Sequence, residues 1–210
     1  MHARNADVDL LGVVLGAALQ GVTANGRGVQ AARRTDEQLL FSRRAARCAA
    51  LADRVAAALP SGTDAEQATA ATRMALADFQ QHAQPTSWPE VCARAVLLDG
   101  LLGDAIAKLQ LGDEVRSLLG ADQGPDARSL LSEALAGALD ADPSSRGSVS
   151  LYGRRLLGEL LSQVQRVAAA NPGLASLLTG KAEGEDVESV TQMMAELATA
   201  HAHRMAELGL

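Results

Sequence analysis

The sequence predicts an all-α protein, and three observations carry that prediction. Alanine and leucine supply 42 and 32 of the 210 residues, and both are strong helix formers. Only four residues are aromatic, so the aromatic and β-branched segments that a sheet needs are scarce. Several apolar runs follow capping residues, which satisfy the free N–H groups of a first helical turn. We predict one domain over residues 1–210, with a core at about 7–141 and further helices at about 146–210.

Four long helices are predicted in the first half of the chain. The first is apolar on nearly every side, as in a helix enclosed by neighbours, and is broken by Asn25-Gly26 and Gly28. The second begins at Thr35, and its apolar residues follow the 4-3 spacing of a bundle seam. The third and fourth also begin with capping residues, and the fourth repeats the 4-3 spacing from Val91. The predicted ranges are about 7–24, 35–60, 63–84 and 87–109.

Four further helices, separated by glycine and proline, are predicted in the second half. Their predicted ranges are about 114–119, 126–140, 148–170 and 186–207. A turn at 174–179 and a charged linker at 181–185 precede the last of them. Together with the first four, these helices predict a compact antiparallel bundle with additional helices.

The charge is distributed unevenly along the chain, and the net charge is −6. Residues 1–60 hold eight basic and five acidic side chains, whereas residues 61–210 hold eleven and twenty. Only the arginines of the second helix offer a basic surface, so nucleic acid is not an expected partner. The two cysteines, Cys48 and Cys92, form no CxxC pair and predict reduced thiols in the cytoplasm.

One apolar run near the start of the chain invites comparison with a membrane span. The run from Leu10 to Val22 is shorter than the roughly 20 residues that a spanning helix needs. Asp7 and Asp9 precede it, where a secretory signal carries net positive charge. We therefore predict no membrane contact.

Helical bundles often hold a metal pair with Glu-x-x-His motifs and further carboxylates that project into the core. None of His82, His201 and His203 has a glutamate three residues before it. The inward stripes of the first two helices hold no carboxylate, because Asp53 falls on the outer side of its helix. The spacing therefore predicts no metal site and no cofactor.

Arg44 and Asp99 are the main candidates for a functional charge pair. Phe41 belongs to the apolar row of the second helix. Arg44 lies about 60° from that row around the helix axis. A functional Arg44 would anchor an anion or pair with a buried carboxylate. The alternative is an arginine at the rim of the bundle whose charged end reaches water. Asp99 interrupts the apolar residues of the fourth helix and is the best candidate for that partner, since a buried carboxylate needs pairing. The alternative for Asp99 is a solvated position at a helix edge or kink.

Further polar residues lie in apolar or helical surroundings. Glu159 and Gln163 lie one helical turn apart. As for Asp99, each is either a buried polar group that needs a partner or a solvated residue at a helix edge. Asp78 and His82 are four residues apart and predict a surface pair. His201 falls on the apolar stripe of the last helix, where it is either a satisfied core histidine or the acid-base group of the chain.

Five stretches, spread over nearly the full length, resemble the bacterial ferritin-like proteins similar to the tRNA hydroxylase that acts on methylthio-isopentenyl-adenosine. The most specific of them is the run YGRRLLGELLSQVQRV at residues 152–167. The other stretches are LLGV at 10–13, LADR at 51–54, DGL at 99–101 and AHAHRMAELGL at 200–210. The resemblance implies a ferritin-like antiparallel four-helix bundle with additional C-terminal helices, and descent from a di-iron carboxylate protein.

The resemblance also implies that the metal ligands are lost. Ala18 and Arg44 stand where such relatives carry glutamates in the first two helices. Ala127 and Ser129 stand where a histidine and a glutamate are expected, and Asp99 alone is kept. The family's activity is therefore not transferred to this chain.

Our leading hypothesis is a metal-free, degenerate ferritin-like bundle, a pseudoenzyme with a binding or assembly role in which Arg44 replaces iron beside Asp99. Its expected partner is a second copy of the chain or a ferritin-like paralogue. The alternative is an enzyme that uses the bundle cavity, with His201, Glu159 and Asp99 as polar groups and a small-molecule ligand. Such an enzyme is cofactor-independent, or a tRNA hydroxylase-like di-iron oxygenase if metal is found. A third hypothesis, tRNA binding, rests on the arginines of the second helix alone.

Overall fold

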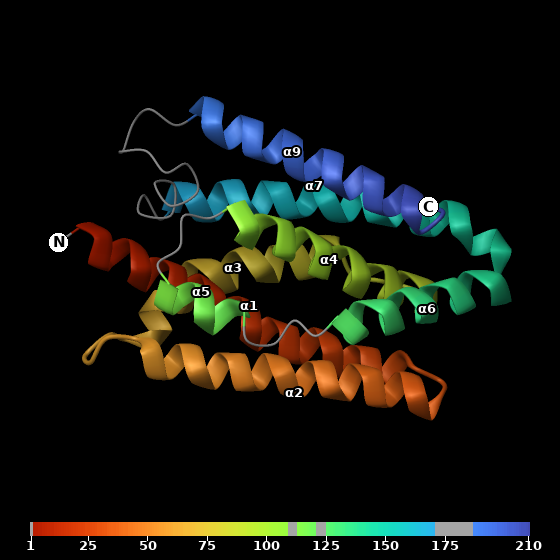
Figure 1. Cartoon of the computed structure of the whole chain (residues 1–210), viewed down its shortest axis with the longest axis horizontal. Helices are drawn as coiled ribbons and strands as arrows, with labels where there is room; N and C mark the ends of the chain where they lie inside the picture. The colour runs from red at the N-terminus through yellow and green to blue at the C-terminus, as the bar shows by residue number, and fades with distance from the viewer. Residues whose placement is uncertain (1, 109–112, 121–124, 171–186) are drawn as a thin grey trace.

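The computed structural model describes residues 2–108, 113–120, 125–170 and 187–210, which are helical apart from short connections (Figure 1). No strand occurs within these ranges, so the prediction of an all-α protein is confirmed. The predicted turn at 174–179 and linker at 181–185 lie outside the described residues. The helices are α1 (His2–Ala31), α2 (Thr35–Ala58), α3 (Ala65–His82), α4 (Trp88–Lys108), α5 (Asp113–Gly120), α6 (Pro125–Ala141), the 3-10 turn η1 (Pro143–Ser145), α7 (Arg146–Ala170) and α9 (Val187–Glu207).

The long helices lie side by side, with α2 along one edge of the molecule and α9 along the opposite edge (Figure 1). α1 packs on α2 and α3, and α4 packs on α6, α7 and α9. Gly12 of α1 faces Ala68 of α3, and Gly16 faces Thr72 one turn further along both helices. α1 and α3 therefore run in the same direction, and the glycines of α1 let the two backbones approach closely.

The predicted break after residue 24 is wrong, because α1 continues through Asn25-Gly26 and Gly28 to Ala31. Gly28 is buried against the ring of Phe41, and a Cβ at this position would overlap that ring. The glycine serves helix packing here, and tertiary contacts override its low helix propensity. The Asn25 side chain bonds back to the Gly21 carbonyl oxygen within the same helix, at 2.8 Å.

Capping side chains set the starts of α3 and α4 close to their predicted positions. The Asp64 carboxylate accepts hydrogen bonds from the backbone N–H groups of Glu66 and Gln67 at the start of α3. At the start of α4, the Glu90 carboxylate accepts from the backbone N–H of Thr86 at 2.7 Å and from its hydroxyl at 2.9 Å. The bonds to Asp64 occupy donors that the first turn of α3 leaves free, and the bonds to Glu90 hold the residue that leads into α4.

The buried stripe of α4 differs from the predicted 4-3 seam by one position. The sequence places Val91, Leu98 and Leu102 on the seam, but Leu102 is exposed and Leu98 and Val91 are only partly buried. The inward positions belong to their neighbours Cys92, Ala93, Val96, Leu97, Gly100 and Leu101. α4 packs against α1, α6, α7 and α9, and a helix with several neighbours buries a wide face that one periodic pattern does not define.

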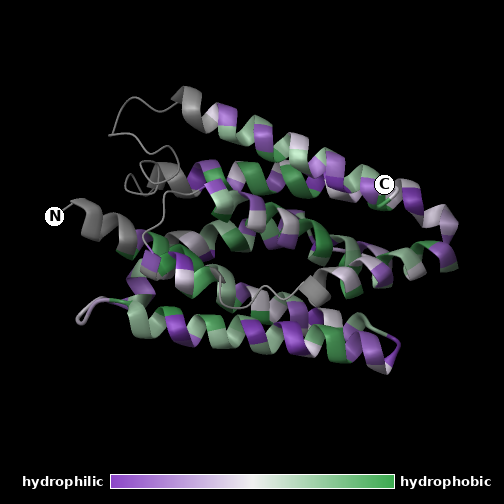
Figure 2. Ribbon diagram, in the orientation of Figure 1, coloured by the Kyte–Doolittle hydropathy of each residue, from purple (hydrophilic) through white to green (hydrophobic). Residues whose placement is uncertain are grey.

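The core is made mainly of aliphatic side chains from every layer of the bundle. Figure 2 shows apolar residues along the inner helices and alternating apolar and hydrophilic residues along α2. Phe41, Val96 and Leu131 form one cluster at the α2, α4 and α6 contact, and the rings of Phe41 and Trp88 meet edge to face at 5.7 Å. A larger cluster lies between α3, α4, α6, α7 and α9. Its buried residues include Phe79, Cys92, Leu97, Leu135, Leu139, Val149, Tyr152, Leu156 and Met205.

Among the described residues, α1 is the one helix whose length and composition suffice to cross a membrane, over Val8–Ala31. The argument from length does not hold for this helix, because α1 continues beyond Val22 to Ala31. The prediction of no membrane contact stays a prediction. In this structure, Gly12 and Gly16 pack on α3 and Gly21 faces Cys48 of α2. The apolar composition of α1 is that of a helix with neighbours on several sides.

Candidate functional site at Arg44 and Asp99

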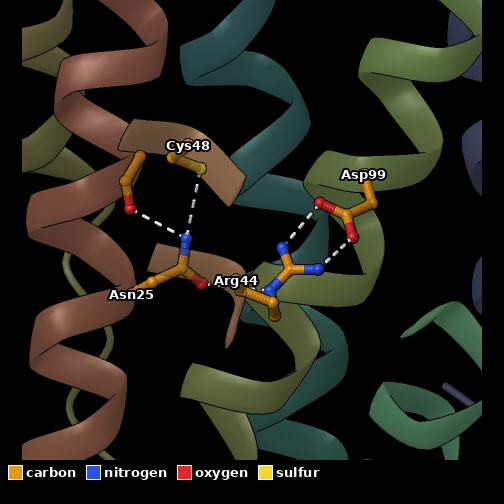
Figure 3. Close-up of polar contacts among 5 residues, drawn as sticks. Asn25, Arg44, Cys48 and Asp99 are labelled. Carbon is orange, nitrogen blue, oxygen red and sulfur yellow. Dashed lines mark hydrogen bonds and ion pairs between the residues drawn. The ribbon is translucent and has the colours of Figure 1, made fainter. Parts of the chain in front are cut away.

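Arg44 of α2 joins three helices through its guanidinium group (Figure 3). Its Nη1 donates to Asp99 Oδ2 of α4 at 2.6 Å, and its Nη2 donates to Asp99 Oδ1 at 2.7 Å. Its Nε donates to Asn25 Oδ1 of α1 at 3.0 Å. Two parallel bonds between guanidinium and carboxylate are the strong, directional form of this ion pair.

The ion pair is largely removed from solvent. The Arg44 side chain is 14% exposed and that of Asp99 is 29% exposed. At this depth the attraction between the charges is screened less than at the surface, and loss of one partner leaves the other poorly solvated. The structure therefore places Arg44 against a carboxylate of the bundle, in a pair that keeps partial contact with solvent at Asp99.

Asn25 orients the Arg44 side chain and was missed in the sequence. Its Nδ2 donates to the Gly21 carbonyl oxygen at 2.8 Å and lies 3.7 Å from Cys48 Sγ, while its Oδ1 accepts from Arg44. Both ends of a buried amide are thereby used. The glycine that follows Asn25 favours a turn in sequence, which conceals its place inside a helix.

Burial makes both thiols poor nucleophiles. It raises the pKa of the half-buried Cys48 thiol, and the nearby Arg44 cation opposes this rise. It raises the pKa of Cys92 to about 12, with a smaller contribution from Glu37. The thiolate is the reactive form, so neither position has the environment of a catalytic cysteine.

We predict that a thiol reagent at pH 8 modifies Cys48 slowly and leaves Cys92 unmodified in the folded protein. Cys48 is partly accessible, whereas Cys92 is fully buried. Time-resolved labelling of the parent and of the Cys48→Ser variant measures both rates. Rapid modification of Cys92 in Cys48→Ser would contradict the burial of α4.

The residues around Arg44 do not fit a di-iron centre. Such a centre needs several carboxylates and imidazoles that converge on the metal ions. Arg44 brings a cation instead, and its partners are one carboxylate, Asp99, and one amide, Asn25. Ala18 is buried and has no donor atom, Ser129 is exposed, and the side chain of Ala127 lies outside the described residues. Within the described part of the chain, no three His, Cys, Asp or Glu side chains form a group that could hold a metal ion.

His201 is buried in the contact between α9 and α7. The side chain is 1% exposed, and its Nε2 lies 3.0 Å from the Gly153 carbonyl oxygen, to which it donates as the neutral tautomer. Its Nδ1 is buried and has no hydrogen-bond partner among the described residues. Burial lowers the pKa of His201, the Arg204 cation lowers it further, and the bond to Gly153 opposes the change.

The lowered pKa of His201 predicts a loss of stability in acid. In the unfolded chain, the imidazole binds a proton near its ordinary pKa of 6.5, and in the folded protein it does so only at lower pH. The unfolded state therefore binds more protons in the interval below pH 6.5, so the free energy of unfolding falls as the pH is lowered through that interval. Urea unfolding at pH 7.5 and pH 5.5 measures the loss.

The variant His201→Gln keeps a donor toward Gly153 but does not titrate, so it is expected to lose less stability between these two pH values than the parent protein. The exposed His203 provides the control variant His203→Gln. Equal acid dependence in the parent and in His201→Gln would assign the effect to other groups.

The other candidates from the sequence have separate partners. The Glu159 carboxylate lies 3.8 Å from His82 of α3, and Asp78 of α3 pairs with Arg166 of α7 at 2.7 Å. The predicted pair of Asp78 with His82 is therefore wrong, because both side chains reach across to α7. Gln163 is 3% exposed, and neither of its amide atoms has a hydrogen-bond partner among the described residues.

The three candidates for catalysis do not form one constellation of contacts. Asp99 is engaged with α2, Glu159 with α3, and His201 with the α7 backbone. General acid-base chemistry needs groups within hydrogen-bond reach of one reacting centre. The observed contacts give these three residues structural partners in three different places.

A second polar cluster, also missed in the sequence, fixes the connection between α3 and α4. Arg94 Nη1 donates to the Ala83 carbonyl oxygen at 2.7 Å, and the Tyr152 hydroxyl donates to the same oxygen at 2.8 Å. The Arg94 guanidinium also lies over the Phe79 ring, 5.0 Å from its centre. These contacts satisfy the end of α3 and have a structural role.

The described helices form an all-α bundle, which is the architecture of ferritin-like proteins. A family model described as the ferritin-like domain of actinomycetes matches residues 4–181. The match covers most of the chain, so this protein belongs to that family, and the prediction of a ferritin-like bundle is confirmed. No curated protein matches the chain. The whole of α9 lies beyond the matched residues.

Proposed function

We propose that this protein is a ferritin-like bundle with a binding or assembly role, in which the Arg44–Asp99 ion pair takes the place of a metal centre. The observation that supports the proposal is the bidentate contact of Arg44 with Asp99, completed by Asn25. A carboxylate that is largely removed from water needs a compensating positive charge. Here a guanidinium group supplies the positive charge.

A metal ion is disfavoured at this position for an electrostatic reason. A divalent ion beside Asp99 would lie next to the Arg44 cation, or would have to displace it from two charge-assisted hydrogen bonds. The remaining neighbours are an amide and a thiol whose pKa is raised by burial. This donor set is too poor in charge to repay the desolvation of a divalent ion.

The proposal includes an account of ancestry. We infer descent from a protein similar to the tRNA hydroxylases, with ligands replaced at Ala18, Arg44, Ala127 and Ser129 and with Asp99 kept. The oxygenase activity is not part of the proposal, because the residues that remain do not assemble the ligand set. The proposed place of action is the cytoplasm, and the proposed partner is a second copy or a ferritin-like paralogue.

Thermal unfolding in the presence of metal ions tests the proposal. A ligand that binds the folded state raises the melting temperature by mass action. We expect no rise with iron(II), manganese(II) or zinc(II) at concentrations well above that of the protein, and no fall when a chelator is added. A saturable rise with one ion, abolished by Asp99→Asn, would refute the metal-free assignment.

A further inference from the structure

The outer side of α2 carries a second row of residues at bundle spacing, which faces solvent. Six residues at 4-3 intervals make up this row, which we term the outer seam: Leu39, Arg43, Ala46, Ala50, Asp53 and Ala57. All six are exposed, and Leu39 is 49% exposed. α2 lies along the edge of the molecule (Figure 1). Residues at 4-3 intervals lie along one face of a helix, so these six residues form one continuous strip of exposed surface.

The outer seam is complementary in charge to a second copy of itself that runs in the opposite direction. Its centre is an alanine pair, Ala46 and Ala50, and a charged residue stands one step outward on each side. These are Arg43 and Asp53, which have opposite charge. No hydrogen bond or ion pair to either is seen among the described residues.

We propose that a second copy of this chain packs on the outer seam, with the two α2 helices antiparallel across a twofold axis. In this arrangement Ala46 lies opposite Ala50 of the second copy, and Arg43 lies opposite Asp53 of the second copy. Twofold symmetry repeats each contact, so the interface gains two ion pairs from two residues. A parallel alignment brings Arg43 onto Arg43 and Asp53 onto Asp53, which like-charge repulsion disfavours.

The alanines at the centre determine how closely the two helices approach. Small side chains there place the axes near the short end of the range of about 8–10 Å for packed helices. At that distance, long charged side chains from the flanks reach across the contact. Leu39 meets Ala57 of the second copy at each end, so a half-exposed leucine is covered.

This inference rests on the proposed assembly role, and it identifies the outer seam of α2 as the surface through which two copies associate. One helix from each copy makes a small interface, so the association is expected to be reversible and to depend on concentration. Sedimentation velocity over a series of protein concentrations measures it in the full chain. The expected result is a shift from monomer to dimer as the concentration rises, with no larger species.

Charge reversal distinguishes this arrangement from other contacts between copies. Arg43→Asp places like charges opposite each other twice and is expected to weaken the dimer about tenfold, since exposed ion pairs are individually modest. Asp53→Arg is expected to weaken it to the same degree. The double variant Arg43→Asp with Asp53→Arg restores both ion pairs and is expected to return the dissociation constant to within about threefold of the parent value. A damaged fold does not explain such a rescue.

A substitution at the centre of the seam provides the second test. Ala46→Glu places two carboxylates beside each other at the axis, and it is expected to abolish the dimer and leave the melting temperature of the monomer unchanged. Ala77→Glu, on the exposed side of α3, is the matched control and is expected to leave the dimer intact.

The results of these experiments distinguish a failure of the proposed α2 interface from a failure of the proposed function. A dimer that is insensitive to Ala46→Glu and to charge reversal would overturn the inference and leave assembly through another face. A monomer at every concentration would overturn the inference, and the metal-free assignment would still be decided by the metal-binding experiment.

Discussion

Replacement of Arg44 by glutamate is expected to lower the free energy of unfolding by about 3 kcal/mol, which is the cost of breaking a largely buried ion pair. The variant removes the partner of Asp99 and adds a second carboxylate at the same place. Asn25 also loses its donor, so its Oδ1 is left buried without a bond. Urea unfolding followed by circular dichroism measures the change, and sedimentation velocity reports whether the oligomeric state changes with it.

Arg47→Glu is the control for that experiment, because Arg47 lies on the same helix and is exposed. Its expected effect is within about 0.5 kcal/mol, as for most surface substitutions. Arg44→Lys keeps the charge but loses the bidentate geometry, so an intermediate loss is expected. The account fails at this point if Arg44→Glu leaves both the melting temperature and the oligomeric state unchanged.

Replacement of Phe41 by alanine is expected to cost about 4 kcal/mol, within the range for removal of a buried aromatic side chain. Phe41 is buried where α1, α2, α4 and α6 meet, and its ring contacts Gly28, Trp88 and the cluster with Val96 and Leu131. The substitution leaves a cavity that rigid neighbouring helices fill only in part. Chemical denaturation of the variant measures the loss.

A double-mutant cycle with Gly28 tests the reason for that loss. A Cβ at Gly28 overlaps the Phe41 ring in the parent, so Gly28→Ala alone is expected to be destabilising. In the Phe41→Ala background the ring is gone, and the new methyl group fills part of the cavity and favours the helix. We expect a coupling energy of about 1–2 kcal/mol between the two sites. Additive effects would show that Gly28 does not contact Phe41.

The sequence predicts this fold well where one local signal decides the structure. Capping residues such as Asp64 and Glu90 satisfy free backbone groups whatever the tertiary context, and the helices begin near them. The apolar row of α2 from Phe41 to Val55 faces a single side of the bundle, so its periodicity identifies the buried face.

The failures arise where tertiary contacts decide. Considered without its tertiary contacts, Gly28 predicts the end of a helix. In the folded protein, the Phe41 ring occupies the space that a side chain at position 28 would fill. Asn25 has turn chemistry in sequence, and its role appears only once Arg44 and Cys48 are brought to it from another helix. Similarly, Asp78 and His82 are neighbours on a helix surface, and α7 provides a partner for each of them.

The candidate pair itself is predictable only in outline. A charged residue at the edge of an apolar stripe signals a partner, and both Arg44 and Asp99 show that signal. Arg44 and Asp99 are 55 residues apart in the chain, and this separation does not predict which residues of the two helices face each other. The bidentate geometry depends on how α1 packs against both α2 and α4. The sequence likewise offers no signal for the contact between Arg94 and Ala83, which depends on the close approach of two helix ends.

The metal content of the protein produced in cells grown with excess iron decides whether Arg44 replaces a metal centre. Elemental analysis of the purified protein, combined with its mass in solution, gives the number of metal ions per chain. The account predicts iron far below one ion per chain in a folded protein that associates with itself. Stoichiometric iron, one or two ions per chain, would contradict the assignment of Arg44 as the replacement for a metal centre.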